Sequence, residues 1–279
     1  MPVSQWLADA TAQLQQAGIG TARLDSLILL EDTCKQQRSW LLAHPEHMLN
    51  AAHITQLNDQ LRRRAQHEPL AYIRGITEFY GRTFTLTHDV LEPRPESETM
   101  IELLLSHIQH NELQQPRIID VGTGSGALAI TSKLELPHAV VTAIDIDPAC
   151  LVVAKRNARQ LQADVNYLQG DLLQAVRNQN ESPADQTFLL ANLPYVPDDY
   201  QINQAALQEP HIAIFGGPDG LDHYRRLFEQ AASMRVGHVF TEALPFQHQA
   251  LRSIAMDHGY QQATEDDFIQ HFRFYEQQS

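Results

Sequence analysis

The stretch from Ile118 to Ile130 constrains the fold of this chain more than any other. An apolar run ends at Asp120, and glycines at positions 122, 124 and 126 follow before a second apolar segment begins. This order is typical of a buried strand, a tight loop and the first turn of a helix. Glycines let the backbone approach a ligand where a Cβ atom would collide, and the helix N-terminus offers N–H groups to that ligand. The stretch therefore predicts a ligand site at a strand-to-helix turn.

The glycine spacing differs from that of two familiar nucleotide loops. A dinucleotide fingerprint requires G-x-G-x-x-G, whereas this loop reads G-x-G-x-G, and the Gly-Lys-Ser/Thr of a Walker loop is absent. A second apolar run over 139–144 ends at Asp145, where an acid is placed to accept hydrogen bonds from a ribose diol. Loop and acid together predict a nucleoside-like cofactor; for the loop alone, a purely structural turn is the alternative.

Downstream of residue 118, strand-like and helical patterns alternate. The expected strands are 118–121, 140–145, 165–168 and 187–191, with helices over 126–135 and 148–162 and further strands near 236–242 and 271–275. This alternation predicts an α/β domain built on a doubly wound parallel sheet.

Residues 1–75 have helical periodicity instead. Apolar side chains between Trp6 and Leu14 share one helix face, and a later helix is expected over 51–66. That helix ends in Arg62-Arg63-Arg64, which is open to contact with RNA or an acidic partner. A solvated helix end favoured by the helix dipole is the simpler interpretation.

Residues 77–92 differ from the segments on both sides. Phe79, Gly81 and Phe84 are typical of a hairpin or two short strands, which would connect two domains. A helix is expected to follow over 97–107. Near its start, Arg94 and Glu98 either line a pocket or form a surface ion pair, and their spacing does not distinguish the two.

Composition argues against a broad nucleic-acid-binding surface. The chain of 279 residues has 20 Lys and Arg against 34 Asp and Glu, a formal charge of −14, whereas nucleic-acid affinity depends largely on cationic contacts. This balance suits a basic protein partner. No apolar run approaches the length of a membrane span, and no basic residue precedes Arg23. These features predict a cytoplasmic protein that binds neither membrane nor nucleic acid directly.

Cysteines and histidines predict neither disulfides nor a metal site. Cys34 and Cys150 form no C-x-x-C pair. The 14 histidines are scattered without the spacing of metal ligands, so no metal is expected.

A polar tetrapeptide, Asn192-Leu193-Pro194-Tyr195, follows the predicted strand 187–191. Ligands of open α/β sheets bind beyond the carboxyl ends of the strands, so this motif is expected beside the glycine loop. Asn192 brings an amide, and Pro194 keeps Leu193 extended and aims its carbonyl. With the flat ring of Tyr195, the motif fits a planar amide or amine. An Asn-Pro turn with a core tyrosine is the alternative.

These motifs resemble those of class I S-adenosylmethionine-dependent methyltransferases that modify planar amino groups. Further stretches narrow the resemblance to the HemK/PrmC family, the peptide chain release factor glutamine methyltransferases. They are Pro-Leu-Ala-Tyr-Ile-Arg-Gly-Ile-Thr-Glu-Phe at 69–79, Pro-Arg-Pro-Glu-Ser-Glu at 93–98, and Glu-Pro at 209–210 followed by Gly-Gly-Pro-Asp-Gly-Leu at 216–221 and Tyr224. The resemblance extends over nearly the whole chain.

The resemblance implies a three-part chain. Residues 1–75 would be a small all-α domain that docks the substrate, 76–92 a β-hairpin linker, and 93–279 a Rossmann-like class I methyltransferase domain. The implied reaction transfers a methyl group from S-adenosylmethionine to the side-chain amide of the glutamine in a release factor's Gly-Gly-Gln motif. A monomer is expected.

Carried over by position, the resemblance also assigns site residues. The cofactor would be held by Gly122, Thr123, Gly124, Ser125 and Gly126 at its methionine part, Asp145 at its ribose, Asp171 and Leu172 at its adenine, and Asn192. The substrate glutamine would be held by Asn192, Leu193, Pro194 and Tyr195.

Leu193 stands where the family usually has a proline, and Asn-Leu-Pro-Tyr is more similar to rRNA adenine dimethyltransferases. A nucleic-acid adenine methyltransferase is therefore the second hypothesis, although the acidic composition and the Gly-Gly-Pro-Asp-Gly segment favour the first. A third hypothesis is a binding module that keeps the cofactor pocket without turnover.

Overall fold

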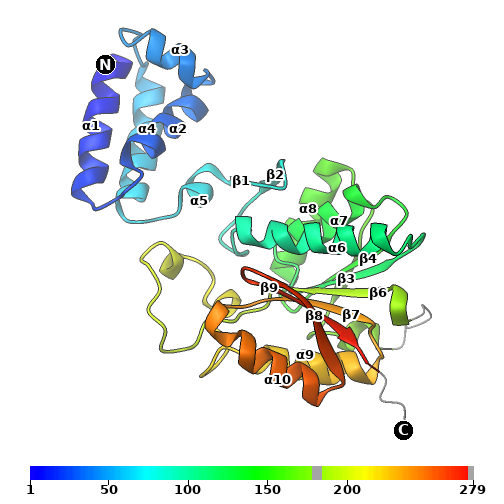
Figure 1. The fold of residues 1–279 in the computed structure, drawn as a ribbon. Helices are drawn as coiled ribbons and strands as arrows, with labels where there is room; N and C mark the ends of the chain where they lie inside the picture. Colours follow the sequence, from blue (N-terminus) through cyan, green and yellow to red (C-terminus); the bar gives the residue numbers. More distant parts are fainter. Residues whose placement is uncertain (178–183, 276–279) are drawn as a thin grey trace. The chain divides into compact units, whose positions relative to one another are not determined.

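The computed structural model describes residues 1–177 and 184–275 (Figure 1). The chain divides into two compact units. The helical unit comprises Met1–Ile76 with Ile202–Gln208, and the sheet unit comprises Thr77–Gln201 with Glu209–Ser279. None of the described helices combines the length and the apolar character that a membrane span requires.

Short helices build the helical unit around one apolar core. They are α1 (Val3–Gln16), α2 (Ala22–Cys34), α3 (Arg38–Ala43), α4 (Ala51–Ala65) and α5 (Leu70–Arg74). Trp6 and Leu14 of α1 pack with Leu30 of α2 and Leu57 of α4, and all four side chains are buried. Asn50 caps α4, because its side chain accepts the N–H of His53 at 2.8 Å. The predicted all-α N-terminal domain is confirmed.

The three consecutive arginines of α4 all form ion pairs within the helical unit. Arg62 pairs with Asp59 on the surface, and Arg63 pairs with Glu68. Arg64 instead reaches Asp25 of α2 at 2.7 Å, where the two side chains are only 13% and 6% exposed. The triplet is therefore partly a structural element that joins α4 to α2.

We expect Arg64→Ala to lower the free energy of unfolding of the helical unit by about 3 kcal/mol, because it leaves the Asp25 carboxylate buried without its cation. Arg62→Ala, the matched control, should cost less than about 1 kcal/mol because its ion pair is exposed. The chain has two tryptophans, Trp6 and Trp40, and both lie in this unit. Urea unfolding of the full chain, followed by tryptophan fluorescence, measures the difference. Equal stability of the two variants would contradict a structural role for Arg64.

A seven-stranded sheet with the strand order β5-β4-β3-β6-β7-β9-β8 forms the centre of the sheet unit. The strands are β3 (Arg117–Val121), β4 (Val140–Asp145), β5 (Asn166–Gln169), β6 (Thr187–Ala191), β7 (His238–Glu242), β8 (Tyr260–Asp266) and β9 (Ile269–Phe274). From β5 to β7 all neighbours are parallel, as predicted, whereas β9 runs antiparallel to both β7 and β8. The sequence did not predict β8. It is an edge strand with mostly exposed side chains, so it lacks the apolar alternation of a half-buried strand.

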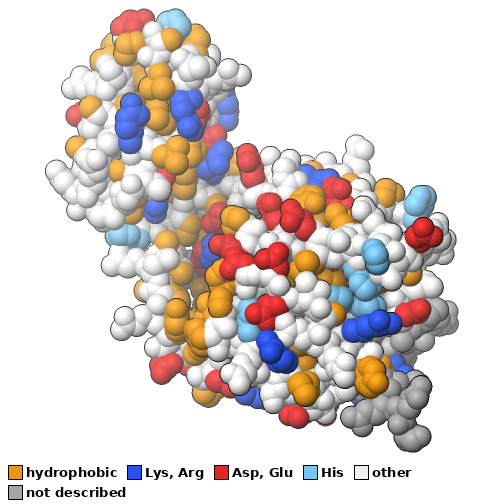
Figure 2. Space-filling view, viewed as in Figure 1, with side chains coloured by type: hydrophobic (Ala, Val, Ile, Leu, Met, Phe, Trp, Pro, Cys, Tyr) orange, Lys and Arg blue, Asp and Glu red, His pale blue; other side chains and the backbone are white. Residues whose placement is uncertain are grey.

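Helices cover both faces of this sheet (Figure 1). One face carries α6 (Glu98–His110), α7 (Ala127–Glu135) and α8 (Pro148–Leu161), and the other carries α9 (Asp222–Ser233) and α10 (His248–Asp257). Every residue of β3 and β6 is buried, as expected for central strands covered on both faces. On the face of the unit seen in Figure 2, acidic, basic and apolar side chains are interspersed.

A two-stranded sheet of β1 (Ile76–Phe79) and β2 (Arg82–Thr85) precedes α6, where the sequence predicted a hairpin. The buried amide of Asn157 in α8 fastens it. The N–H of Thr85 donates to the Asn157 oxygen at 2.7 Å, and the Asn157 nitrogen donates to the carbonyls of Thr85 and Ser125 at 3.0 and 2.9 Å. One side chain therefore joins β2 to the glycine-rich loop.

Candidate functional site

The glycine-rich loop after β3 is held against β4 by its own backbone. The N–H groups of Gly122 and Thr123 both donate to the carbonyl of Ile144, at 2.9 and 3.0 Å. The glycines at 122, 124 and 126 have φ values of 72°, 52° and 84°, a region that other residues rarely adopt. Backbone conformation alone therefore favours glycine at these positions.

Two of the glycines also differ in what surrounds them. A Cβ on Gly124 would meet no atom within 4 Å, so this position faces open space. A Cβ on Gly126 would lie 2.9 Å from Ile130 and 3.1 Å from Ala154 of α8. Gly124 thus exposes backbone to a ligand, whereas Gly126 allows α7 and α8 to pack closely.

Asp120 is hydrogen-bonded to the glycine-rich loop and to the helix that follows it. One of its carboxylate oxygens accepts the hydroxyl of Thr123 at 2.6 Å and the N–H of Ala129 at 3.1 Å. The side chain is buried, and desolvation raises its pKa to about 7. Asp120 therefore ties the loop to the first turn of α7.

A cavity of about 1260 Å³, including the solvent at its mouth, opens beyond the carboxyl ends of β3, β4 and β6. Its lining contains most of the predicted site residues, namely Gly122, Thr123, Gly124, Ser125, Asp145, Asp171, Leu172, Asn192, Leu193 and Pro194. Gly126 and Tyr195 are not among the lining residues. The structure thus brings the glycine loop, the acid after β4 and the polar tetrapeptide to one cavity, as the parallel strands predict.

Arg94 and Glu98 are also absent from this lining. Arg94 forms an ion pair at 2.7 Å with Glu209, whose side chain is 2% exposed. Glu98 accepts the backbone N–H of Tyr80 at 2.7 Å. The sequence left open whether Arg94 and Glu98 line a pocket or form an ion pair. In the described structure they line no part of this cavity, and each binds another partner.

Asp145 lies at the tip of β4 with both carboxylate oxygens engaged. One accepts the N–H of Gly124 and the other the N–H of Asp147, each at 2.9 Å. The residue is 7% exposed, and burial raises the pKa of its carboxyl group. Backbone donors fix the orientation of this carboxylate, while each oxygen keeps a further lone pair for a ligand hydroxyl.

The cavity lining also contains Leu172, which is buried and has a positive φ of 52°. Its neighbour Asp171 forms an ion pair with Arg226 of α9. Arg226 and His223 line the cavity as well, although the sequence did not single them out. This part of the lining therefore combines an apolar side chain with a charged rim.

A chain of hydrogen bonds fixes the amide of Asn192. Its Nδ2 donates to the hydroxyl oxygen of Ser97 at 2.9 Å, and Ser97 in turn donates to Oε2 of Glu242. Both Ser97 and Glu242 are buried. Burial raises the pKa of Glu242 to about 7. Within the described residues, no protein donor to Asn192 Oδ1 is found.

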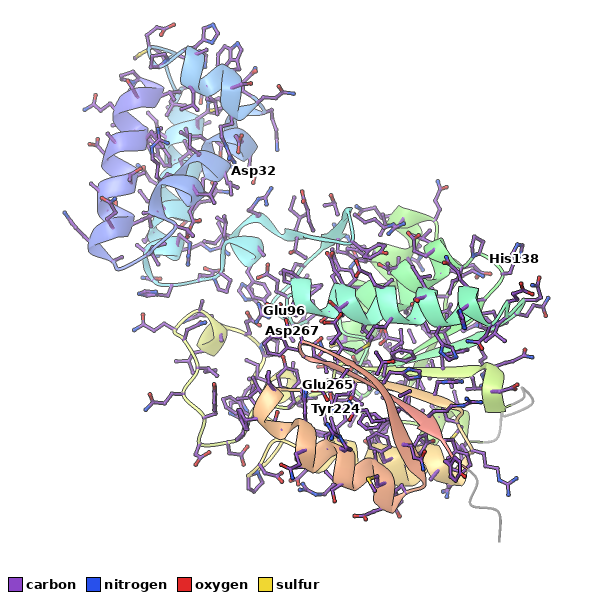
Figure 3. All side chains as sticks on the ribbon, in the orientation of Figure 1. Asp32, Glu96, His138, Tyr224, Glu265 and Asp267 are labelled. Carbon is purple, nitrogen blue, oxygen red and sulfur yellow. The ribbon has the colours of Figure 1, made fainter. Side chains whose placement is uncertain are left out.

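Two tyrosines complete this network. The hydroxyl of Tyr195 donates to Oε1 of Glu242 at 3.1 Å, so this ring binds the network and not the cavity. Tyr224 of α9 is labelled in Figure 3, and its hydroxyl accepts the N–H of Leu193 at 3.3 Å. The same hydroxyl lies 3.1 Å from the carbonyl of Ala191 and also contacts that of Glu242. Tyr224 therefore positions the backbone of the motif against the end of β7.

Comparison with known proteins decides the family. The model described as "PrmC N-terminal domain" matches residues 5–75, and that described as "Methyltransferase small domain" matches 97–206. The release factor glutamine methyltransferase of Coxiella burnetii is 35% identical over 248 residues, which cover 88% of this chain and 87% of that protein. That of Deinococcus radiodurans is 31% identical over 98% of this chain and 97% of its own length.

This chain belongs to the release factor glutamine methyltransferase family. The predicted family membership is thereby confirmed.

Solved structures share the fold at low sequence identity. The hMettl16 catalytic domain in complex with MAT2A 3'UTR hairpin 1 has a TM-score of 0.56 and 13% identity, covering 91% of this chain and 92% of that chain. A T. thermophilus 16S rRNA methyltransferase in complex with AdoMet and guanosine has a TM-score of 0.52 and 17% identity, covering 72% and 50%. These values show a common fold only. The expected Rossmann-like class I methyltransferase fold is confirmed.

Sequence reasoning assigned no role to the residues that hold Asn192 and Leu193 in place, although the family motifs include Ser97 and Tyr224. Ser97, Tyr224 and Glu242 belong to three elements that are distant in the sequence, so no local spacing connects them. For Glu242, a polar residue at the end of a buried strand that contains Val239 and Phe240 was the available signal.

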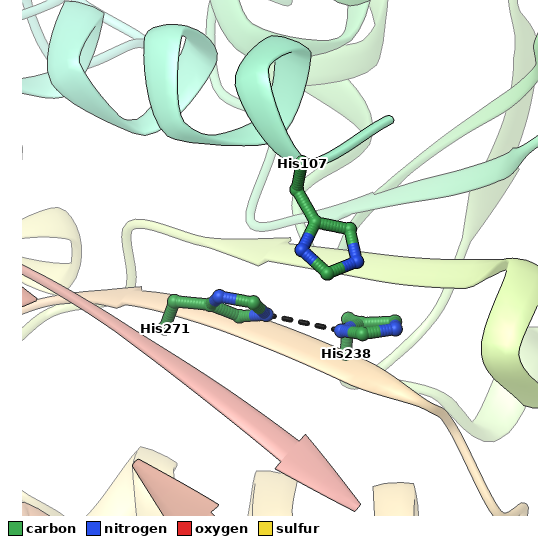
Figure 4. A group of neighbouring side chains, drawn as sticks. All are labelled: His107, His238 and His271. Carbon is green, nitrogen blue, oxygen red and sulfur yellow. Dashed lines mark hydrogen bonds between the residues drawn. The ribbon is translucent and has the colours of Figure 1, made fainter. Parts of the chain in front are cut away.

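Three histidines also converge in the sheet unit, although the sequence suggested that all histidines are scattered. His107, His238 and His271 place one ring nitrogen each within 4.8 Å of the others (Figure 4). They lie outside the lining of the cavity. Strand pairing, and not sequence spacing, brings them together.

Proposed function

We propose that this chain transfers a methyl group from S-adenosylmethionine to the side-chain amide nitrogen of the glutamine in the Gly-Gly-Gln motif of a release factor. The observation that carries the proposal is the position of Asn192 and Leu193 in the same cavity as Gly124 and Asp145. An amide-binding motif thus faces a nucleoside-binding motif. The descriptions of the curated relatives support the same substrate class.

The cavity residues fit S-adenosylmethionine chemically. Gly124 allows a ligand to approach the backbone, and Asp145 offers carboxylate lone pairs to a ribose diol. Leu172 and Ile146 provide apolar surface for the adenine, beside Asp171. When bound, this cofactor supplies a methyl group that is already activated on a sulfonium. The protein residues therefore need to bind, orient and exclude water.

The hydrogen-bond chain determines which side of the Asn192 amide faces the substrate. Ser97 has one hydroxyl hydrogen, and it is used toward the Glu242 carboxylate. Ser97 must then accept from Asn192, which turns Nδ2 toward Ser97 and leaves Oδ1 available. An oxygen, and not an NH2 group, is what a substrate amide N–H requires. Ionised Glu242 thus sets Asn192 in the productive orientation.

The proposed catalytic residues act by alignment. An amide nitrogen is a poor nucleophile because its lone pair is delocalised. Asn192 Oδ1 and the Leu193 carbonyl would accept its two hydrogens and turn the nitrogen toward the methyl group. Such positioning can contribute roughly 7–11 kcal/mol. The same two dipoles stabilise the positive charge that develops on nitrogen, and the proton then leaves to water.

Leu193 in place of a proline is compatible with this role. The required group at that position is a backbone carbonyl, which every residue provides. Pro194 restricts Leu193 to an extended conformation, and the Tyr224 hydroxyl holds the Leu193 N–H. The side chain of Leu193 is 4% exposed and packs in the core. Packing and one hydrogen bond therefore replace the stiffness of a second proline ring.

The remaining assignments follow the family analogy. We assign residues 1–75 to substrate docking, 76–92 to a β-hairpin linker and 93–279 to the methyltransferase domain. The enzyme would act as a cytoplasmic monomer, without a metal ion in the methyl-transfer reaction and without direct contact to nucleic acid or membrane.

Mass spectrometry of a co-expressed release factor tests the proposal. We expect one added methyl group on the glutamine of the Gly-Gly-Gln motif, and none when that glutamine is replaced by asparagine. Incubation of the purified enzyme with labelled S-adenosylmethionine and rRNA is the parallel arm. Methylated adenine with an unmodified release factor would instead support the nucleic-acid hypothesis, which rests on the Asn-Leu-Pro-Tyr motif. Cofactor binding without transfer to either substrate would support a binding module.

A further inference from the structure

Three histidines from separate elements meet on one face of the sheet (Figure 4). His107 lies in the last turn of α6, His238 begins β7, and His271 lies in β9. β7 and β9 are paired so that Phe240 is opposite His271. Because side chains alternate along a strand, His238 and His271 project from the same face as Phe240, toward α6. The strand register therefore builds the cluster.

The ring nitrogens are close to the spacing of metal ligands. His238 Nδ1 and His271 Nε2 are 3.0 Å apart, and the ligand atoms of all three rings lie within 4.8 Å of one another. Tetrahedral zinc, with Zn–N distances of about 2.0–2.1 Å, places its nitrogen ligands about 3.3 Å apart. The His107 nitrogen must therefore approach the other two by up to about 1.5 Å for all three to reach that spacing.

The two buried rings are held rigidly. Phe188 stacks on His238 with a centroid distance of 4.7 Å, and Phe240 stacks on His271 at 4.1 Å. A backbone hydrogen bond to Asp185 engages His238 as well, and the second nitrogen of this ring points away from His271 (Figure 4). Such an outer hydrogen bond is the usual device that orients a metal-bound imidazole.

We propose that His107, His238 and His271 form a binding site for one zinc-type divalent transition-metal ion, which fastens the end of α6 to β7 and β9. Three neutral imidazoles are ligands that zinc prefers, and water supplies the fourth position of such a site. Burial lowers the pKa of all three rings, so they are neutral at neutral pH. One hydrogen lies between His238 Nδ1 and His271 Nε2, and binding of the ion at both atoms requires the donor ring to carry that hydrogen on its other nitrogen. His107 is partly exposed and gives the ion access from solvent.

The site is separate from the proposed methyl-transfer site. His238 begins β7 and Glu242 ends it, which at about 3.3 Å per residue puts them about 13 Å apart along the strand. The histidines lie toward the amino end of the parallel strands, whereas the cavity opens beyond the carboxyl ends. The ion is therefore expected to stabilise the fold without taking part in the reaction.

One charged neighbour opposes binding and provides a sharp test. Arg273 lies two residues after His271 on β9, and its positive charge lowers the pKa of all three histidines. The same field disfavours a metal cation. Arg273→Gln should therefore tighten zinc binding.

Zinc titration of the tag-free full-length protein by calorimetry, with elemental analysis after dialysis, tests the site. We expect one equivalent of bound zinc, a higher thermal midpoint, and at least a tenfold weaker affinity in His107→Ala. His110→Ala is the matched control, because His110 is an exposed histidine of the same helix. Cobalt in place of zinc should give the visible absorption of a tetrahedral site in the wild type and in His110→Ala only.

Binding of less than half an equivalent, or equal affinity of His107→Ala and His110→Ala, would overturn the proposal. The cluster would then be a group of neutral imidazole rings that only pack together. Circular dichroism of His107→Ala checks that the fold is kept. Since the experiment reads metal content and stability, its outcome is independent of the methyl-transfer assignment.

Discussion

Replacing Asn192 by alanine is expected to lower kcat by about 1000-fold, which is the size of effect seen when one preorganised polar group at a reacting centre is removed. The variant loses the Oδ1 acceptor, so the substrate amide keeps only the Leu193 carbonyl and can rotate away from the methyl group. Binding of S-adenosylmethionine should be largely unchanged, because the glycine loop and Asp145 are held by contacts that do not involve Asn192. Single-turnover methylation of a purified release factor and calorimetry with the cofactor measure the two quantities.

Asn166→Ala is the matched control for this experiment, since Asn166 is exposed on the edge strand β5. It should retain wild-type turnover. Retained activity in Asn192→Ala, or loss of cofactor binding together with activity, would refute the assignment of Asn192 as the residue that holds the substrate amide.

Glu242→Gln is expected to lower kcat by about 100-fold, with a smaller change in KM, although Glu242 does not line the cavity. A glutamine can donate to Ser97 through its NH2 group. Ser97 is then free to donate to Asn192, which would turn the Asn192 NH2 toward the substrate. The substrate amide then loses the Asn192 Oδ1 acceptor, although the side chain at position 242 keeps its shape. Ser97→Ala removes the hydroxyl that links Glu242 to Asn192 and should lower kcat by a similar factor. Glu229→Gln, at an exposed position, should leave kcat unchanged.

The same variant gives a pH test. Burial, the largest cause, raises the pKa of Glu242 to about 7; nearby Glu96 raises it further, while hydrogen bonds from Ser97 and Tyr195 and the charge of Arg94 lower it. Because the ionised form orients Asn192, kcat of the wild type should fall as pH drops below about 7. In Glu242→Gln that fall should be absent. An unchanged pH profile in the variant would show that Glu242 has no positioning role.

Stability should respond to pH in the opposite direction. The folded-state pKa of Glu242 lies above its ordinary value of 4.5. The folded state therefore binds more protons than the unfolded state between pH 4.5 and about 7. This contribution to stability is complete below pH 4.5 and is lost as pH rises through about 7. Glu242→Gln should remove this part of the pH dependence, so it should unfold at a more constant urea midpoint across that range.

Much of the fold was predictable because local pattern and tertiary position agree. The buried runs that became β3, β4 and β6 are central strands, covered on both faces, and their apolar sequences report that directly. The polar edge strand β8 and the antiparallel end of the sheet were not predictable in this way, since exposed side chains leave no periodic signal. Arg64 illustrates the same limit, because its buried partner Asp25 is two helices earlier in the chain.

The sequence by itself determined which motifs line the cavity. Glycines 122 and 124, Asp145 and the tetrapeptide at 192 are short motifs that follow β3, β4 and β6, and parallel strands that neighbour one another carry such ends to one edge. Only the tertiary structure decided which residues hold these motifs in place, namely Ser97 from the 3-10 turn before α6, Tyr224 from α9 and Glu242 from β7. It also decided that His107, His238 and His271 meet. Those contacts depend on strand register and on the rotation of each helix about its axis. A single sequence carries no local signal for either.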